Sequence, residues 1–102
     1  MSIKKQYLKS KNICKVTFTL PKKSADSAKK VFLVGDFNDW KSNSAEMNAL
    51  KNGNHKTTLE LEPGHEYQFR YFLGGKKWVN DDSADKYVPN KVSGEDNSVV
   101  VV

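Results

Sequence analysis

Two tryptophans occupy positions from which this chain could bind a ligand that contains rings. Trp40 ends the segment VFLVGDFNDW, which reads as a strand that breaks at Gly35 and continues into a polar turn. Trp78 follows a second turn-like stretch, GGKK. An indole just past a strand end can present a flat apolar face, and the axial C–H faces of sugar rings stack on such a face. The alternative is that both rings cap the ends of a hydrophobic core.

Arg70 is a second candidate for ligand contact. The alternation of residues 65–73 places Tyr67, Phe69, Tyr71 and Leu73 on one face of a strand and Gln68, Arg70 and Phe72 on the other. An outward guanidinium there has two interpretations, of which composition alone favours the first. One is an ordinary surface cation that pairs with Glu60 or Glu62, and the other is a hydrogen-bonding fork for hydroxyl groups near the tryptophans.

The acidic run Asp81, Asp82 and Asp85 could suggest a metal site or a carboxylate pair for glycoside hydrolysis. Its spacing does not match a calcium loop, and neither His55 nor His65 has partners at metal-ligand spacing. Capping of turns and loops explains the run better. The sequence also lacks a nucleophile signature and a phosphate-cradling glycine loop. We therefore expect no catalytic residues, no metal and no cofactor.

Composition indicates one small domain outside membranes. The chain has 102 residues, no apolar stretch of membrane-spanning length, no secretory signal and a single cysteine, Cys14, expected to be buried. Together these features predict a cytoplasmic protein. The net charge of +5 comes from scattered lysines without an arginine cluster. A solvated surface is therefore the better interpretation, and nucleic-acid binding is unlikely.

Short strands separated by turn signals predict an all-β sandwich of two antiparallel sheets. Hydrophobic alternation or apolar runs mark the expected strands, at residues 13–20, 30–37, 56–62, 65–73 and 98–102. Asn52-Gly53 and Pro63-Gly64 predict tight turns. Residues 80–97 show no period and are expected to form a long surface loop. We expect residues 1–12 to be a basic N-terminal extension, ordered at most in part, and residues 13–102 to form a single domain.

Four segments in sequence order resemble the glycogen-binding modules of carbohydrate-binding module family 48. These modules also precede the catalytic barrel of isoamylases and branching enzymes, and occur in the β subunit of AMP-activated protein kinase. The resemblance lies in residues 31–40 (VFLVGDFNDW), 61–64 (LEPG), 67–75 with Trp78 (YQFRYFLGG) and 94–100 (GEDNSVV). It covers nearly the whole chain from about Ile13.

The resemblance implies an immunoglobulin-like, early-set β-sandwich that binds α-1,4-linked glucan. Trp40 and Trp78 match the two stacking tryptophans, and Arg70 matches a lysine that bonds sugar hydroxyls. Val92 matches a leucine that wedges into the glucan turn. Asp96 and Asn97 match an asparagine pair whose first member contacts sugar. Because Asp96 replaces that asparagine, its ionised carboxylate can only accept hydrogen bonds.

The expected function is therefore a non-catalytic module for glycogen, starch or maltooligosaccharide. An alternative is an interaction module of the same fold that has lost sugar binding and either self-associates or docks to a glucan-processing enzyme. A glycoside hydrolase or a branching enzyme is the partner class that the resemblance implies.

Overall fold

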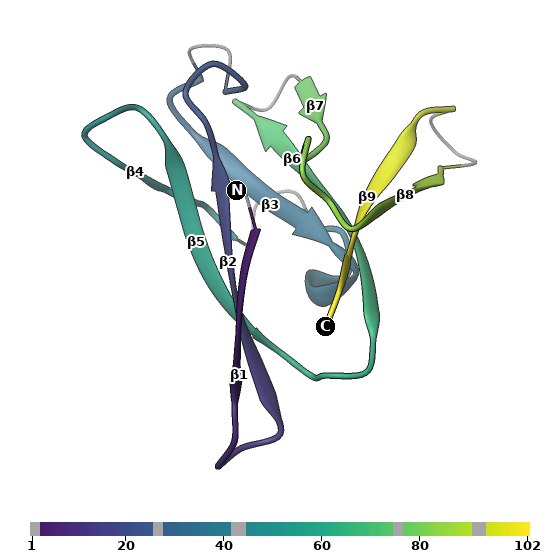
Figure 1. Cartoon of the computed structure of the whole chain (residues 1–102). Helices are drawn as coiled ribbons and strands as arrows, with labels where there is room; N and C mark the ends of the chain where they lie inside the picture. The colour runs from purple at the N-terminus through teal and green to yellow at the C-terminus, as the bar shows by residue number, and fades with distance from the viewer. Residues whose placement is uncertain (1–2, 26–27, 42–44, 75–76, 91–93) are drawn as a thin grey trace.

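Two antiparallel β-sheets face each other in the computed structural model, which describes residues 3–25, 28–41, 45–74, 77–90 and 94–102 (Figure 1). The predicted immunoglobulin-like sandwich is confirmed. The first sheet has the strand order β1-β2-β5-β4, and the second has the order β3-β6-β9-β8 with β7 also paired to β6. No helix among the described residues combines the length and apolar character that crossing a membrane requires.

The strands of the first sheet are β1 (Ile3–Leu8), β2 (Ile13–Leu20), β5 (His55–Leu61) and β4 (Asn48–Ala49). The strands of the second sheet are β3 (Val31–Gly35), β6 (Glu66–Leu73), β9 (Asp96–Val101), β8 (Lys86–Pro89) and β7 (Lys77–Val79). One short 3-10 helix among the described residues, η1 (Asp36–Asn38), follows β3.

The core lies between the inner faces of the sheets, where the alternating residues of β2 meet those of β6. Phe18 of β2 packs edge-on against Phe69 of β6, with ring centroids 5.1 Å apart. Phe37 of η1 closes the same cluster at 5.9 Å from Phe18. Cys14 is buried and free, as expected. The inward-facing residues of β6 thus pack in the core, and the alternate residues of the same strand face outward.

Two segments differ from the expectation. Residues 3–8, expected within a basic extension, form strand β1, which pairs with β2 and reaches the opposite sheet through a Lys5–Asp85 ion pair of 2.7 Å. The prediction that residues 80–97 form an unbroken loop is wrong, because they contain β8 and the start of β9. An edge strand such as β8 is held by backbone hydrogen bonds to one neighbour and needs no apolar alternation.

Two glycines permit backbone arrangements that position the second sheet, namely a tight turn and a close approach of two strands. Gly64 has φ +84° in the predicted Pro63-Gly64 turn, which carries the chain from the first sheet to the second. Gly35 ends β3 against β6, where a Cβ would lie 2.8 Å from that of Phe69 and would also meet the Gln68 carbonyl. Any side chain at residue 35 would therefore push β3 away from β6.

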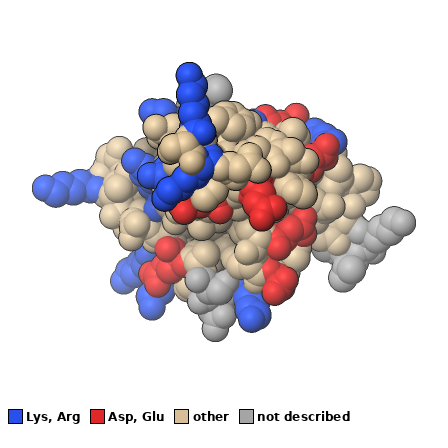
Figure 2. All heavy atoms as spheres, turned by 90° about the horizontal axis from the view of Figure 1, so that it is seen from below, with Lys and Arg blue, Asp and Glu red and all other residues tan. Residues whose placement is uncertain are grey.

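Charge is distributed rather than gathered on the face seen from below. Basic side chains project from the outline of the molecule at several places, with acidic side chains between them (Figure 2). This view agrees with the expectation that most of the net charge of +5 is solvated surface charge.

Candidate functional site

An aromatic ladder lies on the outer face of the second sheet. Phe72 of β6 stands opposite Phe32 of β3 on one side and opposite Trp78 of β7 on the other. The rings of Phe72 and Trp78 stack with centroids 4.4 Å apart and a tilt of 32°. Trp78 nevertheless remains 37 % exposed. The stack fixes one face of the indole against the sheet and leaves the rest of the ring open to solvent.

Arg70 lies beside this ladder but is far more buried than expected, at 5 % exposure. Its Cζ lies 5.8 Å from the centroid of the Trp78 ring, a cation–π distance. Its Nη2 lies 3.4 Å from Oε1 of Glu95, whereas its buried Nε has no hydrogen-bond partner. The predicted pairing with Glu60 or Glu62 is wrong. Glu60 lies in β5 of the first sheet, and Glu62 follows that strand and contacts His65.

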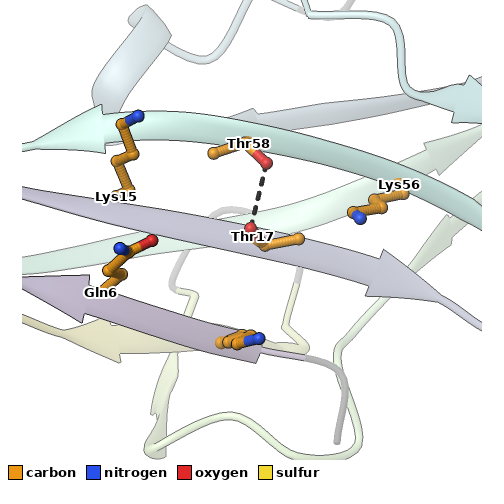
Figure 3. Close-up of a pocket in the computed structure, with 6 residues that line it drawn as sticks. Gln6, Lys15, Thr17, Lys56 and Thr58 are labelled. Atoms are coloured by element: carbon orange, nitrogen blue, oxygen red, sulfur yellow. Dashed lines mark hydrogen bonds between the residues drawn. The ribbon is translucent and has the colours of Figure 1, made fainter.

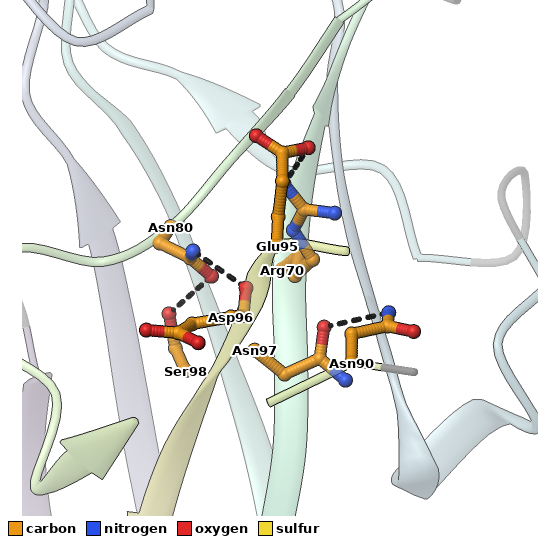
Figure 4. A network of polar contacts seen from close by, with 7 residues as sticks. All are labelled: Arg70, Asn80, Asn90, Glu95, Asp96, Asn97 and Ser98. Carbon is orange, nitrogen blue, oxygen red and sulfur yellow. Dashed lines mark hydrogen bonds and ion pairs between the residues drawn. The ribbon is translucent and has the colours of Figure 1, made fainter. Parts of the chain in front are cut away.

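Asn97 is buried in an amide chain next to Arg70 (Figure 4). Its Nδ2 donates to Oε1 of Gln68 at 3.1 Å, and its Oδ1 accepts from Nδ2 of Asn90 at 3.1 Å. Both ends of the Asn97 amide are therefore occupied. Within the described structure, the Nε2 of Gln68 remains a donor without a protein acceptor.

Asp96 sits at the start of β9 with an exposed side chain, close to Asn80 and Ser98 (Figure 4). Its backbone carbonyl accepts from Nδ2 of Asn80 at 2.8 Å, and the Ser98 hydroxyl donates to Oδ1 of Asn80 at 2.8 Å. Asn80 thus fastens the segment after Trp78 to β9. The Asp96 side chain points to the opposite side of β9 from Asn97, so the structure does not bring it together with Arg70 and Trp78.

A buried carboxylate supports this face from inside the sandwich. Asp81, 2 % exposed, accepts from the Tyr71 hydroxyl at 2.6 Å and from the Ser83 amide at 2.7 Å, and its carbonyl accepts from the Tyr87 hydroxyl. Burial, together with the adjacent Asp81 carboxylate, raises the pKa of the Tyr71 phenol well above 10.0, so Tyr71 stays a donor. Turn and loop capping by the acidic run is confirmed for Asp81.

Trp40 lies at the opposite end of β6 from Trp78. Its Nε1 donates to Oδ1 of Asp36 at 2.8 Å, and Oδ2 of the same carboxylate accepts from the backbone amide of Gln68 at 2.8 Å. Trp40 adopts φ +60°, a left-handed conformation that bulky residues rarely adopt. The ring is half-buried. The unusual backbone conformation and the bond to Asp36 together fix the position of this indole, and such strain is commonly found at functional sites.

The two indoles are anchored four residues apart on β6, at Gln68 and at Phe72. At about 3.4 Å per strand residue, the anchor points are separated by roughly 14 Å. Val92, the remaining expected site residue, lies outside the described residues.

Metal chemistry receives no support from the described part of the chain, in which no group of three or more His, Cys, Asp or Glu side chains could hold a metal ion. His55 is buried with an unpartnered Nδ1, and His65 is exposed with its Nε2 3.5 Å from Glu62.

Sequence reasoning did not select three residues that the structure brings to this face: Gln68, Phe72 and Glu95. For Gln68 and Phe72 the signal was present, because strand alternation already placed them beside Arg70. Glu95 gave no such signal, because its approach to Arg70 depends on the pairing of β9 with β6.

Comparison with known families agrees with this geometry. The model of one family, the glycogen recognition site of AMP-activated protein kinase, matches residues 8–102. A search of curated proteins finds no match. The family match covers nearly the whole chain and includes every strand except β1, of which it includes the last residue. The chain therefore belongs to the family of the glycogen recognition site of AMP-activated protein kinase, a family of carbohydrate-binding modules.

Proposed function

We propose that this chain is a non-catalytic module that binds α-1,4-linked glucan on the outer face of its second sheet. The observation that carries the proposal is the exposed Trp78 ring, stacked on Phe72 and flanked by Arg70. An immobilised aromatic ring loses little entropy when a sugar stacks on it. Because Phe72 covers one face of the indole, the sugar uses the face turned to solvent.

Polar groups beside the ring supply orientation. Arg70 retains N–H donors beyond the one directed at Glu95, and Nε2 of Gln68 points its hydrogens at no protein acceptor in the described structure. Both groups donate to glucose hydroxyl oxygens in this proposal. Asn97 holds the Gln68 amide in place. Asp96 remains a proposed acceptor at the margin of the site, because its side chain lies on the opposite side of β9 from Asn97. Val92 remains a proposed apolar contact.

Trp40 provides a second point of attachment in the proposal. The roughly 14 Å between the anchor points on β6 suits an oligosaccharide rather than a single glucose unit. Affinity for a short chain is weak, in the millimolar to high micromolar range, because few contacts offset the lost freedom of the ligand.

Titration with maltoheptaose tests the proposal, with tryptophan fluorescence as the readout. Variants W40F and W78F each leave one indole, so the two rings report separately. We expect saturable changes from both indoles, and weaker binding of cellohexaose, whose β-linkages give a straighter chain. Absence of any change at millimolar maltoheptaose would contradict the proposal and favour an interaction module. Appearance of new reducing ends during incubation would contradict the non-catalytic role.

A further inference from the structure

The outer face of the first sheet contains a basic hollow that the glucan proposal does not use. Six side chains from three adjacent strands line a cavity of about 260 Å³, shown in Figure 3: Lys4, Gln6, Lys15, Thr17, Lys56 and Thr58. The strand register explains the grouping. Lys4, Thr17 and Thr58 stand directly opposite one another across β1, β2 and β5. Gln6 and Lys15 form the next row on one side, and Lys56 belongs to the row on the other side.

The lysines of this hollow are not bonded to any counter-ion within the described structure. Among the described residues, none of the three forms an ion pair or a side-chain hydrogen bond. Glu60, directly opposite Lys15, is a carboxylate on the same face but does not line the cavity. Three ammonium groups around one small cavity repel one another, and an anion between them would relieve that repulsion.

Hydroxyl and amide groups complete the donor set. The Oγ1 atoms of Thr17 and Thr58 lie 3.0 Å apart at the centre of the hollow, and the nitrogen of Lys56 lies on the side of its residue that faces this pair (Figure 3). One hydroxyl donates to the other, so the second retains its proton for a ligand. The Gln6 amide adds two N–H donors at the edge.

We propose that this hollow binds a phosphoryl group carried by a small molecule. Phosphoryl oxygens accept several hydrogen bonds and carry close to two negative charges at neutral pH. Lysines bind phosphate as point charges and need no fixed fork geometry. At about 260 Å³ the cavity is smaller than most drug-sized ligand sites, which suits a phosphoryl group on a small molecule. Its lining holds no aromatic ring and no arginine, which stacked nucleic-acid bases would use, so an isolated phosphorylated ligand fits better than a polynucleotide.

Amide chemical shifts measured during titration with inorganic phosphate, glucose 6-phosphate and glucose test this proposal. We expect saturable shifts at Thr17 and Thr58 with both phosphoryl ligands and none with glucose. Tighter binding of glucose 6-phosphate identifies a sugar phosphate as the ligand, and equal binding identifies the phosphoryl group alone. Shifts caused equally by glucose, or no saturable shift with either phosphoryl ligand, would overturn the proposal.

Matched charge variants separate a site from general attraction. K15E/K56E removes two lysines of the hollow, and K23E/K29E changes the net charge equally at exposed loop lysines outside its lining. With each surface lysine contributing up to about fivefold, the first variant weakens phosphate binding about tenfold. The second stays within about twofold. Equal weakening by both would show non-specific attraction and overturn the proposal.

A neutral variant provides a second check. T17V/T58V removes both hydroxyls, keeps the β-branched shape and lowers affinity about threefold. An unchanged affinity would exclude the hydroxyls as ligands. Maltoheptaose binding is measured on the same variants and stays unchanged, because the hollow and the aromatic ladder belong to different sheets. Loss of one activity therefore leaves the other testable.

Discussion

The outer faces of the two sheets have opposite chemistry on similar backbones. The second sheet presents Phe32, Phe72 and Trp78, with a buried arginine held by a single glutamate. The first sheet presents three lysines and two threonines around a hollow without any aromatic lining. An immobile aromatic surface suits a neutral ring, whereas mobile ammonium groups suit an anion.

The comparison shows where specificity resides in this sandwich. The inner faces of the two sheets use the same residue types, since Val, Leu and Phe from both sheets pack into the shared core. Outer residues do not have to fill the space between the two sheets, so one kind of pleated backbone can carry two different surfaces. The following four substitutions test this contrast.

The substitution W78A has the largest expected effect on the aromatic face. Loss of a central aromatic anchor costs about 2 kcal/mol, so maltoheptaose binding weakens about 30-fold in calorimetric titration. Y7A is the matched control, because Tyr7 is an exposed aromatic of the first sheet. Equal losses in both variants would show that the glucan does not select the aromatic ladder.

The substitution D81N tests the support beneath the same face. The new amide places N–H against either the Tyr71 hydroxyl or the Ser83 amide, both of which donate to Asp81. We expect a loss of about 1–3 kcal/mol in the free energy of unfolding, measured with urea. D82N is the control, because Asp82 is the exposed neighbour of Asp81. We expect it to change the free energy of unfolding by less than about 0.5 kcal/mol. A silent D81N would mean that this network does not hold the loop.

The substitution R70M sharpens the role of the guanidinium. Methionine keeps the apolar stem but removes the donors and the charge beside Trp78, and glucan affinity falls about tenfold. E95Q removes the ion-pair partner and leaves Arg70 in place, so affinity changes less than about twofold. Equal weakening by E95Q and R70M would show that binding depends on the Arg70–Glu95 ion pair rather than on direct hydrogen bonds from Arg70 to the sugar.

The Lys5–Asp85 ion pair, which joins β1 to the opposite sheet, gives the smallest effect. Burial alone would raise the pKa of Asp85, but bonds from Lys5 and from the Val101 amide outweigh it and lower the pKa below 3.8. A lowered carboxyl pKa stabilises the fold above pH 3.8, and this contribution is lost as the pH falls through the folded-state value.

We therefore expect D85N to reduce stability at pH 7 by less than about 1 kcal/mol, because the pair is partly exposed. The difference between D85N and the parent protein shrinks in urea denaturation below pH 3.8. A constant difference across that range would mean that the charge of Asp85 does not contribute.

Much of the fold was readable from local pattern. Alternation in residues 13–20 and 65–73 identified β2 and β6 and separated inner Phe69 from outer Arg70, because side chains of a strand alternate in direction. Turn chemistry found the positive-φ glycines at residues 53 and 64. Strands β1 and β8 were not predicted, because both are largely polar and exposed. Their pairing with a neighbouring strand through backbone groups leaves no local hydrophobic pattern.

The sequence alone predicted the sandwich, the resemblance to the family and the two tryptophans as candidate ligand contacts. The tertiary structure was needed to show that Glu95, rather than Glu60 or Glu62, contacts Arg70. It also showed that Asn97 bonds to Gln68, and that Asp36 links Trp40 to β6. It likewise gathered Lys4, Lys15 and Lys56 into one hollow. The physical reason is register: a local pattern fixes which side of a strand a residue faces, whereas strand pairing fixes which distant residue lies beside it.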